Sequence, residues 1–264
     1  MHFYTKTKDG TIEPRHFVPM TKDPSRTRAS RVTDAKKAAE NGEVWLPSVT
    51  TILNILDKPA LINWKVDKHL EQAYENKVNH RLGEYCDDYI KRIKAITREK
   101  MDEAPKAGTA IHEVLEDYIG KGKRPLDKTE LLICKNVEAA LIEHCGDIGQ
   151  FECEKYFVSD KGYAGCADLS SPEWIIDYKS KKESAKFNPG KMAYPDHRRQ
   201  LGAYGKALCC EGFKAANIFI CLETGEVDFH EHTPEQIEDG YLDFLDCLSI
   251  HQRNNYNPLQ YTNK

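Results

Sequence analysis

The segment Trp174-Ile175-Ile176-Asp177-Tyr178-Lys179 has the composition of a buried strand and yet carries two opposite charges. Side chains alternate between the two faces of a strand, so Asp177 and Lys179 point the same way and the apolar residues next to them point the other way. An acid and an amine are costly to bury unless they pair or bind a ligand. The stretch therefore predicts a core strand with either a buried ion pair or a functional site.

Two further strands precede this stretch and form a meander with it. Residues 151–158 and 163–169 have strand character and are separated by a glycine-containing turn. A second turn at residues 170–173 leads into the charged strand. A hairpin folded about this turn brings Asp168 opposite Asp177, to within a residue or two of register. Two carboxylates are then expected to converge on the sheet.

The rest of the C-terminal half adds two helices and two strands. Residues 195–208 have helical spacing, and Thr233-Pro234-Glu235-Gln236 is a capping box that begins a final helix ending near residue 251. Residues 216–222 and 227–231 read as a strand pair joined by a turn. Helices, then strands, then helix and strand again predict a mixed α/β core, with a mixed central sheet flanked by helices.

A helical region precedes the strands. Ser48 can cap a helix, Pro59 permits a second one, and Gly108-Thr109 can open another. The expected helices are residues 49–56, a segment from Pro59 to about Leu70, residues 82–96, residues 108–120 and residues 130–144. We expect one domain over residues 46–264, with a helical part at 46–145 and the α/β core at 146–264.

Residues 1–45 are expected to form an N-terminal arm followed by a basic polar segment. A short hairpin is predicted around the turn at residues 8–10. In residues 21–42 basic side chains outnumber acidic ones, so this segment could lie along a phosphate backbone or could be a solvated loop followed by a short surface helix. The basic residues include Arg26, Arg28, Arg31, Lys36 and Lys37.

The overall composition is that of a water-soluble globular protein. Apolar residues make up 40% and charged residues 30% of the 264, with a formal charge of −4, so any nucleic-acid surface must be local. No run is long and apolar enough for a membrane helix, and no signal peptide is recognisable, so we expect a cytoplasmic protein, with phage or bacterial origin as a guess from its compact layout. The nine cysteines contain no Cys-x-x-Cys pair, which favours reduced thiols over a metal site or a disulfide framework.

The expected carboxylate pair predicts a metal site. Asp168 and Asp177 would repel each other unless a cation lay between them, and hard oxygen ligands suit Mg²⁺ or Mn²⁺. Lys179 would place a positive charge beside that cation, where it could activate a water or stabilise a phosphate as negative charge develops. Such a set of residues is suited to hydrolysing a phosphodiester.

The motif Gly165-x-x-Asp168 with Asp177-Tyr178-Lys179 resembles the signature of the PD-(D/E)XK nuclease superfamily, in the variant carried by RecB-like exonucleases. That branch also has a Gly-x-x-x-His helix upstream, matched by Gly108 to His112, and a Gln-x-x-x-Tyr helix downstream, matched by Gln200 to Tyr204. The segment Leu46-Pro47-Ser48-Val49-Thr50 is similar to one in the mitochondrial genome maintenance exonuclease and related phage-encoded nucleases. The resemblance covers residues 46–208 and implies a restriction-endonuclease-like core.

The resemblance also implies roles for individual residues. The metal ligands would be His112, Asp168, Asp177 and the backbone carbonyl of Tyr178, with Lys179 as the catalytic lysine. Gln200 and Tyr204 would face DNA, or alternatively serve as a polar cap and a core aromatic. Basic side chains that could hold the phosphate backbone are Lys181, Lys182, Lys186, Lys191, Arg198 and Arg199. Glu116 and Glu154 are either accessory ligands or ordinary surface acids. The cysteine spacing of the iron–sulfur subtypes is absent, so no cluster is expected.

The function predicted from these residues is a magnesium-dependent DNA exonuclease of recombination, repair or replication, acting on single-stranded or duplex ends. Three alternatives share some of the same features. They are a structure-specific or single-strand endonuclease of the same fold, a catalytically inactive DNA-binding accessory protein, and a metal-dependent hydrolase of another phosphate ester.

Overall fold

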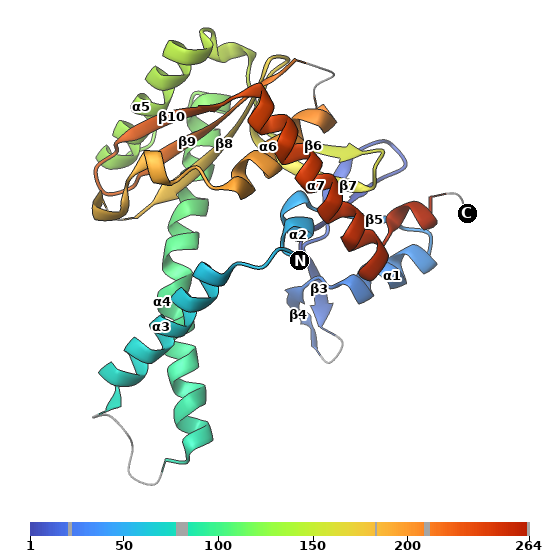
Figure 1. The fold of residues 1–264 in the computed structure, drawn as a ribbon, viewed down its shortest axis with the longest axis vertical. Helices are drawn as coiled ribbons and strands as arrows, with labels where there is room; N and C mark the ends of the chain where they lie inside the picture. Colours follow the sequence, from blue (N-terminus) through green and yellow to red (C-terminus); the bar gives the residue numbers. More distant parts are fainter. Residues whose placement is uncertain (21–22, 78–83, 183, 209–211, 263–264) are drawn as a thin grey trace. The chain divides into compact units, whose positions relative to one another are not determined.

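The computed structural model describes the chain except for residues 21–22, 78–83, 183, 209–211 and 263–264. Its core is a five-stranded sheet of order β10-β9-β8-β7-β6 (Figure 1). The strands are Glu152–Ser159 (β6), Tyr163–Ser170 (β7), Trp174–Lys181 (β8), Lys214–Cys221 (β9) and Val227–His232 (β10). All neighbours are antiparallel except β8 and β9. The predicted meander and the mixed α/β class with helices flanking a mixed sheet are confirmed.

The sheet opens where β7 meets β8. These strands share two residue pairs, Leu169 with Ile176 and Ser170 with Ile175, whereas β8 and β9 share eight consecutive pairs. Asp168 and Asp177 are the next residues after the last pair on each strand. The structure therefore leaves the two aspartates opposite each other, at the point where the hydrogen-bonded ladder between their strands ends.

Helix α6 (Pro195–Leu208) packs on the sheet strands β6 to β9, and α7 (Pro234–Asn254) packs on α6. Two glycines permit this close helix contact. A Cβ on Gly240 would lie 2.6 Å from the backbone carbonyl group of Arg198, and a Cβ on Gly202 would lie 2.8 Å from the carbonyl oxygen of Ile237. Helix α5 (Lys128–Cys145) contacts β10. The predicted capping box at Thr233 and the predicted bounds of α6 are confirmed.

The N-terminal segment contains more strand than predicted. Strands β1 (Phe3–Lys6), β2 (Ile12–Pro14) and β5 (Trp45–Pro47) form a three-stranded sheet, which confirms the predicted hairpin. Strands β3 (Phe17–Met20) and β4 (Asp23–Ala29) form a second hairpin before α1 (Val32–Glu40). For residues 21–42, the alternative of a solvated loop followed by a short helix is therefore wrong in its first part and right in its second. The sequence of β4 is polar and does not alternate, so it gives no local signal of a strand. Strand β3 supplies the backbone partner that makes β4 extended.

Helix α2 (Val49–Leu53) begins as predicted, because the Ser48 hydroxyl accepts a hydrogen bond from the Thr51 amide at 3.0 Å. It ends at Leu53, three residues earlier than expected. Among the described residues, further short helical turns are Glu116–Gly120, of π type, and the 3₁₀ turns Ile148–Gln150, Ser184–Lys186, Pro189–Lys191 and Pro258–Gln260. None of the described helices is both long and apolar enough to cross a membrane.

The chain forms two compact units, of which the first comprises Met1–Ile55 with His112–Lys264 and the second Leu56–Ile111. The second unit contains α3 (Pro59–Glu75) and most of α4 (Cys86–Leu115). Within it, the Tyr89 hydroxyl donates to the carbonyl of Ala73 at 2.9 Å.

Two helices predicted separately, at residues 82–96 and from Gly108, are one continuous helix in the structure, and the separation was wrong. Residues 82 and 83 lie outside the described part of the chain. Pro105 stands inside α4, where it has no amide to donate to the helix, and the Thr109 hydroxyl donates to the Pro105 carbonyl at 3.2 Å. Most of the other residues between the two predicted helices are good helix formers, so the helix continues through Pro105.

Candidate metal centre

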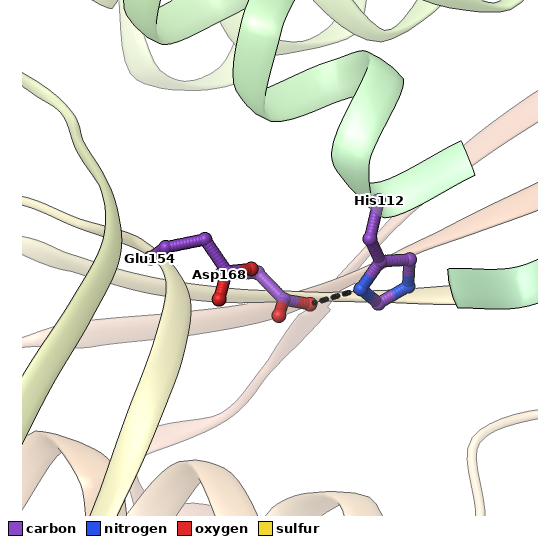
Figure 2. A group of neighbouring side chains, drawn as sticks. All are labelled: His112, Glu154 and Asp168. Carbon is purple, nitrogen blue, oxygen red and sulfur yellow. Dashed lines mark ion pairs between the residues drawn. The ribbon is translucent and has the colours of Figure 1, made fainter. Parts of the chain in front are cut away.

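Three side chains from three different elements converge at the opened part of the sheet. His112 near the end of α4, Glu154 of β6 and Asp168 of β7 each offer a ligand atom, and these atoms lie within 4.8 Å of one another. The Nδ1 atom of His112 is 3.5 Å from Oδ2 of Asp168. Figure 2 shows the Asp168 carboxylate between Glu154 and the imidazole ring. Two carboxylates and an imidazole form a donor set that can hold a divalent cation.

An unusual backbone conformation accompanies the Glu154 carboxylate. Among the described residues, Glu154 is the one non-glycine residue with a positive φ, at 48°. Cys153 and Lys155 on either side keep the same register with β7, so Glu154 lies opposite Asp168 without pairing to it. A non-glycine residue in this region costs about 1 to 3 kcal/mol and persists only where its surroundings enforce it. The sequence identified Glu154 only as a possible accessory ligand, and the structure brings it into the cluster.

Glu154 and Asp168 are both held by neighbours. Oε2 of Glu154 accepts a hydrogen bond from the Cys166 thiol, with a sulfur–oxygen distance of 3.1 Å, and burial raises the pKa of the Glu154 carboxyl. Oδ2 of Asp168 accepts from the backbone amide of Tyr178 at 2.7 Å, which links β7 to β8 beyond their last residue pair. The Asp168 carboxylate is therefore oriented by β8, the strand that also carries Asp177.

His112 packs edge-on against the ring of Tyr178, with centroids 5.5 Å apart. Burial acts to lower its pKa, but the adjacent Asp168 and the charge of Asp177 outweigh burial and leave the pKa of His112 raised. Both carboxylates thus favour positive charge at this place. A bound cation would supply that charge instead and would require the neutral imidazole.

Asp177 lies outside the cluster of three and is held in a separate network. Its side chain is 4% exposed, and Oδ2 lies 2.6 Å from Nζ of Lys179. Oδ1 accepts from Nε2 of Gln200 at 2.8 Å. Burial is the main reason that the pKa of Asp177 is raised, and Asp168 adds to the effect. Burial acts in the opposite direction on Lys179, but Asp177 outweighs it and raises the pKa of the ammonium group.

Helix α6 contributes the Gln200 side chain that joins these groups. Gln200 Oε1 accepts from Lys179 at 3.3 Å, and Nε2 also donates to the Tyr204 hydroxyl at 3.0 Å. Tyr204 is 6% exposed and packs against Phe157 with centroids 5.2 Å apart. This is the surrounding expected of a core aromatic, the alternative that the sequence left open. Contact of Gln200 and Tyr204 with DNA stays a prediction.

The other predicted site residues lie around this network. Arg199 pairs with Asp196 and Asp243 at 3.0 and 2.8 Å. The side chains of Arg198 and Lys181 are partly exposed. Glu116 pairs with Lys121 at 2.9 Å and is not one of the three clustered ligands. The Tyr178 carbonyl as a ligand stays a prediction, as does the absence of an iron–sulfur cluster, since Cys209 and Cys210 lie outside the described residues and the seven described cysteines are free thiols.

Sequence reasoning missed Asn217, which is 0% exposed. It pairs in register with Asp177, and its Nδ2 donates to Oδ2 and to the backbone carbonyl of Asp177 at 3.0 and 3.2 Å. The available signal was a single carboxamide in a strand whose following residues are all apolar. Such a residue needs a buried partner.

Comparison with known proteins does not identify a family. No protein-family model matches the chain, and no curated protein matches it. Among solved structures, one described as the crystal structure of SSO0001 is similar, with a TM-score of 0.29 and 15% identity over 69% of this chain and 85% of that chain. A similarity this low carries no argument about fold or function. Inference about function therefore depends on the chemistry of the cluster.

Proposed function

We propose that the chain is a metal-dependent DNA exonuclease of the PD-(D/E)XK type, in the RecB-like branch, which acts in recombination, repair or replication. One observation carries the proposal. His112, Glu154 and Asp168 converge to ligand distance at the opened sheet, and a carboxylate–ammonium pair of the buried Asp177 and the partly exposed Lys179 lies on the adjacent strand. Both groups consist of the residues that the sequence motif selects, with the addition of Glu154.

The ligand set accounts for the unusual burial of charge. The proposed ligands are His112, Asp168, Asp177 and the Tyr178 carbonyl, with Glu154 added by its position in the cluster. A bound Mg²⁺ or Mn²⁺ would supply a Lewis acid that polarises the phosphate and lowers the pKa of a bound water. Without positive charge, Glu154 and Asp168 repel each other in a partly buried place, and a raised pKa of Glu154 is consistent with burial in such a place.

Lys179 is the proposed catalytic side chain. Its ammonium group is held by Asp177 and Gln200, at 2.6 and 3.3 Å, so it is fixed in position before a substrate arrives. There it orients the attacking water or stabilises the negative charge that develops on the phosphate. The raised pKa of Lys179 keeps this group charged through neutral pH.

DNA is the proposed substrate because of the side chains around the cluster. Lys181 continues β8 beyond Lys179, and Arg198 precedes Gln200 on α6. Basic groups of this kind can hold the phosphate backbone while the ligands engage the scissile bond. The PD-(D/E)XK motif favours DNA over small phosphate esters.

The test is digestion of end-labelled linear DNA and closed circular single strands, with Mg²⁺ or Mn²⁺. We expect shortening of the linear strands and no cleavage of the circles. Asp177→Ala and His112→Ala should lose nearly all turnover and keep their circular dichroism spectra, whereas Glu116→Gln is the matched acidic control and should cleave normally. Cleavage of the circles would contradict the exonuclease proposal and show that the chain is an endonuclease. A wild-type chain that binds DNA but leaves every substrate intact would favour a binding protein.

A further inference from the structure

A chain of buried polar side chains leads from Asp177 across the sheet. Asn217 of β9 is 0% exposed, and His232 at the end of β10 is 5% exposed. Nδ2 of Asn217 lies 3.0 Å from Oδ2 of Asp177, and Oδ1 of Asn217 lies 2.9 Å from Nε2 of His232. The three side chains belong to three adjacent strands, β8, β9 and β10.

Folding alone does not explain a carboxamide at this position. Residues 215–221 are otherwise apolar and all are buried. An unpaired amide there would cost about 1 to 3 kcal/mol, and an apolar side chain of the same size would avoid the cost. Asn217 is tolerated because both ends of its carboxamide are bonded. What distinguishes it from an apolar residue is therefore its effect on Asp177.

The orientation of the carboxamide is determined by its partners. The backbone carbonyl and the ionised carboxylate of Asp177 only accept hydrogen bonds, so Nδ2 must face Asp177, where it donates to both groups. Oδ1 then faces His232, which must donate to it from Nε2. Two bonds to one residue restrain both the backbone and the carboxylate, so rotation of the carboxylate would break at least one of them.

A neutral donor suits a carboxylate that is to meet a cation. Lys179 and Asn217 both donate to Oδ2 of Asp177. The Lys179 ammonium stabilises the ionised carboxylate but repels an approaching cation, whereas the carboxamide stabilises it without adding positive charge. Asn217 can therefore hold Asp177 in place without weakening cation binding.

We propose that Asn217, held in orientation by His232, is a positioning residue that sets the Asp177 carboxylate for binding of the divalent cation. The inference rests on one part of the proposed function, the assignment of Asp177 to the metal centre, and does not depend on the substrate. Removal of a side chain that orients a metal ligand typically costs 10- to 100-fold in metal affinity or activity.

The test is a double-mutant cycle on Mn²⁺ binding, measured by calorimetry with Mn²⁺ alone. The four proteins are the wild type, Asn217→Leu, Asp177→Asn and the double variant. We expect Asn217→Leu to bind Mn²⁺ about 10-fold or more weakly than the wild type and to cause no further loss in the Asp177→Asn background. An equal loss in both backgrounds, or none in the first, overturns the inference.

A control and a second variant guard against a general effect on the strand. Ile218→Val removes one buried methylene from the next residue of β9, and it should leave Mn²⁺ affinity unchanged. If Asn217→Leu does not fold, His232→Leu frees the carboxamide to rotate and should weaken Mn²⁺ binding several-fold, and wild-type affinity in that variant overturns the inference. A wild type that binds Mn²⁺ but leaves DNA intact overturns the proposed function and leaves this inference standing.

Discussion

Several charged side chains at the candidate metal centre are held in place by hydrogen bonds and ion pairs. Lys179 is 28% exposed at the side chain, and its Nζ lies 2.6 Å from Asp177, so under the proposed function the ammonium group needs no rearrangement before reaction. Asp177 accepts hydrogen bonds at both oxygens, while Glu154 and Asp168 face His112. The structure thus separates one carboxylate held by donors from two that face an imidazole. Substitutions of Lys179 and of Glu154 test the two sets of residues separately.

Lys179→Met should lower kcat by about 10²- to 10³-fold, because it removes a fixed positive charge from beside the proposed reaction site. Substrate affinity should change much less, since the charge is needed mainly as the reaction proceeds. Single-turnover kinetics on end-labelled DNA separate the two effects. The control is Lys135→Met, which removes an exposed lysine from α5. A variant with unchanged kcat would show that Lys179 is not the catalytic lysine.

Glu154→Gly should raise stability and weaken metal binding at the same time. Glycine adopts the positive φ of 48° without strain, so the metal-free protein should gain about 1 kcal/mol in free energy of unfolding. The same change removes a carboxylate from the cluster, so Mn²⁺ should raise the melting temperature less than in the wild type. Denaturant unfolding with and without Mn²⁺ measures both effects.

Glu152→Gly is the matched control for that variant. It makes the same substitution in the same strand, at an exposed glutamate that pairs with Lys155. Glycine should lower stability there by about 0.5 to 1 kcal/mol and leave the Mn²⁺ effect intact. If both variants lose stability alike, the strain at Glu154 does not matter to the free energy of unfolding.

Whole elements show how far the sequence specifies the fold. The alternation of residues 174–179 predicts β8, and the capping box at Thr233 predicts the start of α7, because both signals are local. The continuity of α4 through Pro105 could not be predicted from glycine and proline positions, since a helix can tolerate one missing amide. The sequence selected Asp168, Asp177 and Lys179, but Asn217 depends on the parallel pairing of two strands that lie far apart in the chain.

Gly240→Ala tests how closely α6 and α7 pack. The added Cβ would lie 2.6 Å from the backbone carbonyl of Arg198, so α6 must shift, at a cost of about 1 to 3 kcal/mol. Because α6 carries Gln200, the shift should also lengthen the hydrogen bonds to Asp177 and Lys179 and lower kcat. Gly190→Ala is the control, because its nearest neighbour to the added Cβ lies 3.8 Å away. Unfolding midpoints and turnover of both variants check the prediction.

Across the whole molecule, acid should destabilise the fold through buried histidines. Burial, with smaller contributions from His230 and Arg198, lowers the pKa of His232 to about 4. The unfolded chain takes up this proton near pH 6.5. The contribution of the neutral His232 to the free energy of unfolding is therefore complete above that pH and is lost as the pH decreases towards 4. The loss from His232 alone amounts to about 3 kcal/mol at the acid end. Denaturant unfolding from pH 7.5 to 4 should show it.

His232→Leu should make the loss of stability at acid pH smaller by the share that His232 contributes, while the other histidines whose pKa values are lowered by burial, such as His197 and His16, keep theirs. The comparison variant is His69→Gln, which removes a histidine from α3 in the other compact unit and controls for loss of a histidine elsewhere in the chain. An equally steep acid loss in His232→Leu would assign the effect to other groups.

Strands β7 and β8 share little backbone pairing beside the proposed metal centre. The backbone supplies two residue pairs there, and beyond them the Tyr178 amide reaches across to the Asp168 side chain. Under the proposed function, a divalent cation held by both Asp168 and Asp177 would join β7 to β8 at the point where their backbone pairing ends. Metal binding would then stiffen the sheet between these strands, so the metal-bound protein would be the more rigid form.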